Sequence, residues 1–364
     1  MFTFMKAGAR GRVVAGVCFC VLMALSLSGC QTIRFYSQAA AGQYEILARQ
    51  TPASKLIQDP STEPKLKAQL ELVARIRQFA VQELKLRPDG CYLKYADLRR
   101  PYVVWNVNVA APLSLEPKTW WFPIVGRASY RGYFSEAGAR RYAAIWARKG
   151  WDTYIGDVPT YSTLGWFRDP LLNTFIFESE AELADTIFHE LTHRRLFVAG
   201  DTDFNEAFAT TAAAEGVRRW FHASGNTLAY ERYQKEARQE NDFVKLVMAA
   251  RNKLQRVYDD ARLADADKLQ CKAEIIGQMR ARYAKLKERW RVDKSGYDYW
   301  FAEPVNNAQL NTVAAYYDLA PAFQALLRAN GGDMEKFYEA AAVLAKLPLQ
   351  RRHDALRAYL NPNL

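Results

Sequence analysis

Residues 179–209 read SEAELADTIFHELTHRRLFVAGDTDFNEAFA, and this stretch determines how the chain folds around its best candidate site. Ser179, followed three residues later by Glu182, has the capping-box pattern of a helix N-terminus. Apolar residues then recur at helical spacing until Gly200 ends the segment. The sequence therefore predicts one helix from Ser179 onward and, after a turn, a second helix capped by Asp203.

The first of these helices carries a His-Glu-x-x-His motif. His189 and His193 are four positions apart, so their imidazoles project from the same helix face about one turn apart. This spacing suits two ligands of one tetrahedral zinc ion, and Glu190 is placed to act on a water molecule as a general base. The alternative is a helix with two surface histidines and an ordinary glutamate. The other two histidines of the chain, His222 and His353, have no supporting motif.

A catalytic zinc ion needs a third protein ligand and one open position for water. Glu206 is the best candidate, because it falls in the first turn of the second helix and can face back toward the first. The alternative is that Glu206 only completes a capping box with Asp203. In that case the third ligand must be sought elsewhere, among Glu215, Asp201 and His222. Asp185 and Glu215 are candidates for supporting the ligands through hydrogen bonds.

Residues 1–29 have the pattern of a signal peptide, with a basic start and the apolar run Val13–Leu27, which is short for a membrane span. The run ends in Leu-Ser-Gly-Cys30, which resembles a bacterial lipobox and implies that Cys30 is lipidated and becomes the N-terminus. A plain secretory signal is the alternative. Several acyl chains anchor a protein firmly. Gln31 in place of aspartate favours the outer membrane, with the protein facing the periplasm.

The composition is that of a globular protein, 50% hydrophobic and 24% charged. The net charge is +11, and it falls to +8 once the three basic residues of the leader are removed. This charge is spread along the chain, which favours tolerance of anionic surfaces over nucleic-acid binding. Beyond the leader and Cys30, only Cys91 and Cys271 remain, and their pairing is open. The absence of Cys-x-x-Cys excludes thiolate metal sites and thioredoxin chemistry.

We expect an α+β fold that is mainly α, with a lipidated tether over 30–60 and a single domain over 61–364. Within Tyr102–Val109, Asn106 and Asn108 alternate with valines, which predicts a strand. The long periodic stripes after residue 225 predict an antiparallel helical hairpin. The expected parts are a helix near 62–86, a small antiparallel or mixed sheet within 90–178 that includes one helix near 135–149, zinc-site helices over 179–222, the hairpin over 225–291 and C-terminal helices over 300–364. Tyr154–Phe177 is expected to contain turns and aromatic residues.

The His-Glu-x-x-His motif followed by Asn-Glu-Ala-Phe-Ala at 205–209 resembles the gluzincin metallopeptidases, the class of thermolysin and the large zinc aminopeptidases. The resemblance implies one zinc ion per chain, held by His189, His193 and Glu206, with Glu190 as the base. Related peptidases place a tyrosine on a later helix to bind the developing oxyanion, which points to Tyr316 or Tyr317. The alternative is that both tyrosines only pack.

Three features depart from the gluzincin pattern. Only 12 residues separate His193 from Glu206, a shorter interval than in the better-known members. Thr210 stands where thermolysin-like enzymes have an aspartate that orients a histidine ligand. The chain also has no Gly-x-Met-Glu-Asn segment, which binds the substrate amine in the zinc aminopeptidases.

The chain also resembles a family of bacterial lipoproteins described as predicted aminopeptidases. This likeness covers nearly the whole mature chain, and it is carried by Tyr161–Pro170, the zinc motif, Asn306–Leu310 and the pair Tyr316 and Tyr317.

Together, the motifs and resemblances predict zinc-dependent peptide hydrolysis in the bacterial envelope, by an aminopeptidase. A zinc endopeptidase or peptidoglycan-peptide hydrolase is the first alternative. The second is a non-catalytic envelope lipoprotein that uses its hairpin to bind a partner, although the intact Glu190 favours catalysis. The expected partners are a peptide and the membrane, and the sequence leaves the oligomeric state open. Tyr102–Val109 is the best candidate for an edge strand that pairs with substrate, with Asn106 and Asn108 as candidate binding residues.

Overall fold

The structure, a computed structural model, describes residues 32–122, 126–160, 168–317 and 319–360, without the side chains of 315–317. The chain divides into two units, Met1–Ala48 and Arg49–Leu364. In the first unit, residues 32–48 form one helix. Within the described ranges, no helix has both the length and the apolar character needed to cross a membrane.

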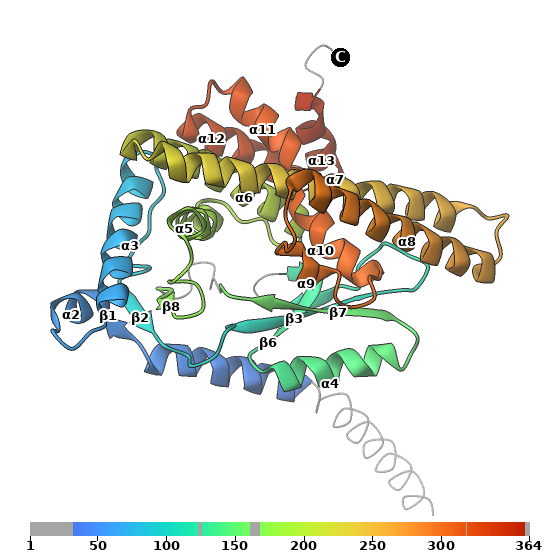
Figure 1. Cartoon of the computed structure of the whole chain (residues 1–364), viewed down its shortest axis with the longest axis horizontal. Helices are drawn as coiled ribbons and strands as arrows, with labels where there is room; N and C mark the ends of the chain where they lie inside the picture. The colour runs from blue at the N-terminus through green and yellow to red at the C-terminus, as the bar shows by residue number, and fades with distance from the viewer. Residues whose placement is uncertain (1–31, 123–125, 161–167, 318, 361–364) are drawn as a thin grey trace, which may run out of the picture. The chain divides into compact units, whose positions relative to one another are not determined.

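The second unit is mainly helical with small sheets, as the sequence predicts (Figure 1). Its helices are α2 (Ala53–Gln58), α3 (Pro64–Gln82), α4 (Glu136–Ala147), α5 (Glu180–Arg195), α6 (Thr202–Ser224), α7 (Thr227–Asp259), α8 (Asp265–Trp290), α9 (Tyr297–Trp300), α10 (Asn307–Tyr317), α11 (Ala320–Ala329), α12 (Met334–Ala345), α13 (Leu349–Arg357) and the 3-10 helix η1 (Ala358–Leu360). Its strands are β1 (Thr51–Pro52), β2 (Lys94–Ala96), β3 (Val104–Ala110), β4 (Trp120–Phe122), β5 (Gly126–Ala128), β6 (Tyr130–Tyr133), β7 (Asp152–Val158) and β8 (Leu171–Leu172).

The main sheet has the strand order β6-β3-β7, and both pairings are antiparallel. β3 is therefore the central strand, and the expectation that Tyr102–Val109 is a free edge is wrong. The cause is β7, a seven-residue strand in a segment that the sequence marked only as turns and aromatics. The predicted alternation of β3 is confirmed, because Val107 and Val109 are buried while Asn106 and Asn108 are half-buried.

Helices cover both faces of this sheet (Figure 1). On one face, the ring of Tyr142 in α4 lies 5.5 Å from that of Tyr133 in β6, whose partner across the sheet is Trp105. On the opposite face, where Asn106 and Asn108 project, α10 lies over β3 and β7. The two smaller sheets have the strand orders β1-β2-β8 and β4-β5.

The helical hairpin expected over 225–291 is confirmed as α7 and α8. Its apolar seam contains Leu254 of α7 and Met279 of α8, and both side chains are buried. The two cysteines beyond residue 30 are free thiols, Cys91 buried and Cys271 half-buried.

Candidate metal centre

Helix α5 begins as its sequence dictates. The Ser179 side chain accepts a hydrogen bond from the backbone of Glu182, and the Glu182 side chain accepts one from the backbone of Ser179, so the predicted capping box is present. The helix is continuous to Arg195, and His189 and His193 therefore project from one face. Their Nε2 atoms are 3.1 Å apart.

Helix α6 begins at Thr202, and its N-cap is Asp201, whose side chain accepts a hydrogen bond from the backbone of Phe204. The expectation that Asp203 caps this helix is therefore wrong, because the chain enters the helix two residues earlier. The capping-box alternative for Glu206 fails with it, since the third helical position belongs to Phe204. Glu206 instead reaches the histidines of α5.

The buried Asn205 side chain fixes the short connection between the two helices. Its Nδ2 atom donates to the carbonyl of Val198, and its Oδ1 atom accepts from the amide of Val198, both at 2.8 Å. The connection is thereby closed directly before Glu206. This explains how an interval of only 12 residues after His193 still brings Glu206 back to α5.

The three predicted ligands converge in the structure. Oε2 of Glu206 lies 3.3 Å from Nε2 of His189 and 3.7 Å from Nε2 of His193, and the candidate ligand atoms all lie within 4.8 Å of one another. Two imidazoles and one carboxylate form the donor set of a catalytic zinc site that keeps its fourth position for water. The residues therefore fit a zinc ion, with Nε2 of each histidine as its binding atom.

The charges of these side chains are strongly coupled. Burial alone would lower the pKa of His189, but the hydrogen bond and charge of Glu206, together with Glu190 and Asp185, raise it to about 9. Burial alone would raise the pKa of Glu206, yet the two histidines hold it well below its ordinary value. In the metal-free protein, a proton on His189 thus pairs with the Glu206 carboxylate, and a metal ion would replace that proton.

Other polar groups surround the cluster. The burial of Asp185, one turn before His189 on α5, raises the pKa of its carboxyl to about 6, and the charge of His189 opposes this shift. Burial of Tyr92, reinforced by the charge of Glu190, raises the pKa of that phenol well above its ordinary value. Glu190 therefore carries its charge close to both His189 and Tyr92.

The remaining candidate ligands are held elsewhere. Glu215 forms ion pairs with Arg218 and Arg219 on its own helix, both at 2.7 Å, so neither a ligand role nor a supporting role fits it. The alternative ligand Asp201 is buried and pairs with two residues of α13, Arg352 and His353. His222 is exposed at the end of α6.

Some predicted site residues lie outside the described part of the chain. These are Cys30, the side chains of Tyr316 and Tyr317, and residues 161–167 of the segment Tyr161–Pro170 that resembles the predicted aminopeptidases. The backbone of both tyrosines ends α10, so their placement on a later helix is confirmed, while their role stays a prediction.

Asn106 and Asn108 line a cavity of about 600 Å³ between the main sheet and the helices α7 and α10. Thr202 and Asp203, at the start of α6, line it too, whereas His189, Glu190, His193 and Glu206 are not among its lining residues. A volume of this size is ordinary for a ligand site. Binding of substrate by the two asparagines stays a prediction.

Three interactions around the site could not be predicted from the sequence. Arg352 and His353 each bind the N-cap Asp201 of α6 from about 150 positions away, and their pattern on α13 carries no motif. Tyr92, in the loop before β2, lies near enough to Glu190 for the charge of Glu190 to raise its pKa. Only the role of Asn205 had a visible signal, because it stands next to Glu206 in the Asn-Glu pair.

The comparisons with known proteins give one family match. Residues 34–356 match the family described as "Putative aminopeptidase". No curated protein and no solved structure matches the chain. Since the match spans most of the chain, the chain belongs to the family described as "Putative aminopeptidase".

Proposed function

We propose that the chain is a zinc-dependent aminopeptidase of the bacterial envelope, anchored by a lipid on Cys30 in the outer membrane and facing the periplasm. The observation that carries the enzymatic part is the convergence of His189, His193 and Glu206, with Glu190 directly after His189 on the same helix. Family membership supports peptides as substrates. The lipobox-like end of the leader supports the anchor.

His189, His193 and Glu206 would hold one zinc ion. A zinc ion held there supplies a Lewis acid that polarises the peptide carbonyl and acidifies a water molecule. Glu206 offsets part of the metal's charge and, in the metal-free protein, keeps the two imidazoles together.

Glu190 acts as the general base and then as the general acid. Its carboxylate accepts a proton from the attacking water as the new C–O bond forms, and then delivers it to the nitrogen of the leaving amine as the peptide C–N bond breaks. We assign stabilisation of the oxyanion to a tyrosine hydroxyl at the end of α10, from Tyr316 or Tyr317.

The first test combines metal analysis with peptide digestion, using the protein from Gln31 onward. We expect about one zinc ion per chain and cleavage of peptides with a free N-terminus, but not of their N-acetylated forms. Equal cleavage of both forms would instead establish an endopeptidase. Absence of zinc-dependent cleavage would leave the non-catalytic lipoprotein.

The variant Glu190→Gln tests the mechanism itself. It should keep its zinc and lose at least about a hundredfold in kcat, because general-base catalysis contributes factors of this order. Glu288→Gln, on the exposed side of α8, is the matched control and should leave both zinc content and kcat unchanged. Undiminished turnover in Glu190→Gln would show that the assigned base is wrong.

A further inference from the structure

One cross-strand row of the main sheet is nearly bare of side chains. Asn106 of β3 pairs with Gly132 of β6 on one side and with Gly156 of β7 on the other. Asn106 and Gly156 line the cavity. Gly132 is covered instead, because a Cβ atom there would lie 3.0 Å from Cγ1 of Val104 and 3.1 Å from Oδ1 of Asn106. The next row, also on the cavity side, contains Asn108 flanked by Tyr130 and Tyr154.

The backbone does not require glycine at position 156. Its φ is not in the positive region, and a Cβ atom there would meet only Cε1 of Tyr154, at an ordinary contact distance of 3.5 Å. A glycine inside a strand weakens the strand, and such a residue often marks a place where a ligand or another backbone approaches closely. The bare surface at Gly156 therefore suits the close approach of a bound molecule.

Asn106 offers that molecule a matching polar group. Its side chain is half-buried, and its carboxamide has no hydrogen-bond partner within the described parts of the chain. A carboxamide has both donor and acceptor atoms, as a peptide group does, and can pair with one. The row thus combines an open backbone surface at Gly156 with one carboxamide, that of Asn106, which can pair with a peptide group.

A second carboxamide stands on the opposite wall. Asn311 of α10 lines the same cavity, and its Oδ1 atom accepts a hydrogen bond from Arg251 of α7. Its Nδ2 atom is buried and has no partner among the residues described. Buried donors in folded proteins are nearly always paired, so an acceptor on a bound ligand would satisfy this one.

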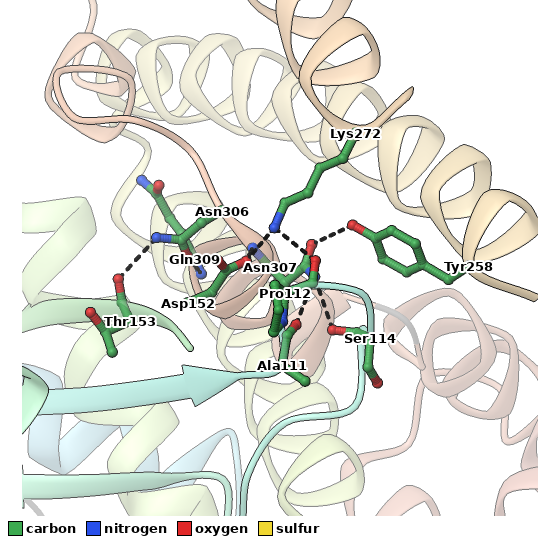
Figure 2. Close-up of polar contacts among 10 residues, drawn as sticks. All are labelled: Ala111, Pro112, Ser114, Asp152, Thr153, Tyr258, Lys272, Asn306, Asn307 and Gln309. Atoms are coloured by element: carbon green, nitrogen blue, oxygen red, sulfur yellow. Dashed lines mark hydrogen bonds and ion pairs between the residues drawn. The ribbon is translucent and has the colours of Figure 1, made fainter. Parts of the chain in front are cut away.

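A polar network fixes the start of α10, and thereby Asn311, relative to the sheet (Figure 2). The Nδ2 atom of Asn307 donates to the carbonyls of Ala111, Pro112 and Ser114, each at 3.0 Å. The hydroxyl of Tyr258 donates to Oδ1 of Asn307 at 3.0 Å. Asn307 lies one turn before Asn311, so both walls of the cavity are held in place.

The same network ties the hairpin to the sheet. The carboxylate of Asp152, at the start of β7, accepts hydrogen bonds from Nζ of Lys272 at 2.5 Å and from the backbone amide of Asn307 at 2.9 Å. Asn306 donates to the carbonyl of Thr153 at 2.9 Å. Residues 306–310, one of the segments that resemble the predicted aminopeptidases, therefore hold one wall of the cavity in place and are not part of the candidate metal centre.

We propose that Asn106 and Gly156 of this row form a binding site for the main chain of an extended peptide, which lies on the sheet face with a peptide group paired to Asn106 and an acceptor near Asn311. This inference deepens the proposed function by naming the part of the substrate that is recognised, and it rests on that function. Main-chain recognition implies tolerance of many side chains at this position.

Gly156→Ala is the sharpest test, because the new methyl group enters the cavity and touches only Tyr154. Its unfolding temperature should be at least that of the wild type, because glycine weakens a strand, while peptide binding weakens by at least about tenfold. Asn106→Ala should weaken binding by up to about tenfold, as for loss of one hydrogen bond. The matched control is Gly277→Ala, an exposed glycine of α8 with no atom within 4 Å of the added methyl.

Binding is measured by fluorescence with a labelled mixture of short unstructured peptides, in the Glu190→Gln background so that no peptide is consumed. A second arm replaces single amides of one bound peptide by esters, which removes the N–H and weakens the carbonyl as an acceptor. One replacement should weaken binding to the protein with Asn106 intact and have no effect after Asn106→Ala. With Glu190 intact, Asn106→Ala should have the same pH profile of kcat as the wild type.

Four outcomes separate this inference from the proposed function. Peptide binding that is equal in Gly156→Ala and Gly277→Ala overturns the inference, and so does a complete lack of peptide binding. If the wild type cleaves peptides and neither Gly156→Ala nor Asn106→Ala changes binding or cleavage, the proposed function holds and the inference does not. If peptide binding weakens in Gly156→Ala and Asn106→Ala but the wild type cleaves no peptide, the inference holds and the proposed function does not.

Discussion

Glu206 is the residue on which the metal assignment depends most. The two histidines are set by one helix, but Glu206 reaches them from another, and its Oε2 atom lies within 3.7 Å of both Nε2 atoms. With Asp201 as the N-cap of α6, no capping role competes for its carboxylate. Its low pKa follows from the two imidazoles, so its charge belongs to this cluster.

Replacing Glu206 should therefore remove the metal. Glu206→Ala leaves two ligands, and zinc affinity should fall at least 10–100-fold, since even changes beyond the direct ligands typically cost that much. Glu206→Gln should be nearly as damaging, because the amide lacks the charge that offsets the dication. Zinc per chain after dialysis measures both. Glu215→Gln, on the same helix but paired with arginines, should keep its zinc, and full occupancy in Glu206→Gln would contradict the assignment.

The residues that the sequence could identify are those whose spacing is local. His189, Glu190 and His193 lie within one helical turn, and Glu206 follows after a short connection, so a motif contains them all. Asp201 and Arg352 are 151 positions apart, and their buried ion pair depends on how α13 packs against the start of α6. No pattern along the chain encodes such a contact.

Glu178 gives the protein a pH-dependent stability. Its burial, reinforced by Glu182, raises its pKa from 4.5 to about 7, so the folded protein binds more protons than the unfolded chain between these values. The free energy of unfolding should thus fall as pH rises from 4.5 to 7, by at most about 3 kcal/mol. Glu178→Gln should remove this fall, as measured by urea denaturation at both pH values. Glu288→Gln should retain it, and an unchanged slope in Glu178→Gln would refute the assignment.

At the scale of elements, helices were easier to predict than strands. The capping box of α5 and the long apolar stripes of α7 and α8 are strong local signals, and all three helices form where expected. β7 was missed because both of its faces are half-buried, which removes the alternation that marks a strand. Without β7, the central position of β3 could not be inferred.

The packing of α5 against α6 depends on Gly216. A Cβ atom at this position would lie 2.6 Å from Cδ2 of Phe188 and 2.7 Å from Cδ1 of Leu84. Phe188 is fully buried and directly precedes His189, so a displaced ring would disturb the packing of α5 next to a candidate ligand. The close approach of the two helices is thus linked to the geometry of the centre.

Gly216→Ala should lower the free energy of unfolding by about 1–3 kcal/mol, the usual cost of overpacking, and weaken zinc binding in the folded fraction. Gly277→Ala is the helical control. With open space around it, this variant should be more stable by about 0.5–1 kcal/mol, because alanine favours the helix. Thermal unfolding and zinc titration measure both variants, and a stable Gly216→Ala with normal zinc affinity would contradict the packing argument.

At the scale of the whole molecule, the second unit builds a candidate metal centre, a cavity and the polar network around Asn307 from segments spread between β3 and α13. The family match covers residues 34–356 and so includes all of these segments. If the leader is removed and the chain is anchored as proposed, its net charge of +8 suits a position beside an anionic surface. The tether expected over 30–60 is too long, because 32–48 form a helix and the second unit, with β1 and α2, begins at Arg49.

Cys30→Ser tests that anchor. Without the thiol, no acyl chain can be attached, and one or more buried chains supply the affinity that keeps such a protein on a membrane. The variant should therefore move from the membrane pellet to the soluble periplasmic fraction, while mass spectrometry of the wild type should find acyl groups on the peptide that begins at Cys30. Cys271→Ser, a half-buried free thiol, is the matched control and should stay in the pellet. A Cys30→Ser protein whose leader is cleaved but which still sediments with membranes would show that something other than the lipid holds it there.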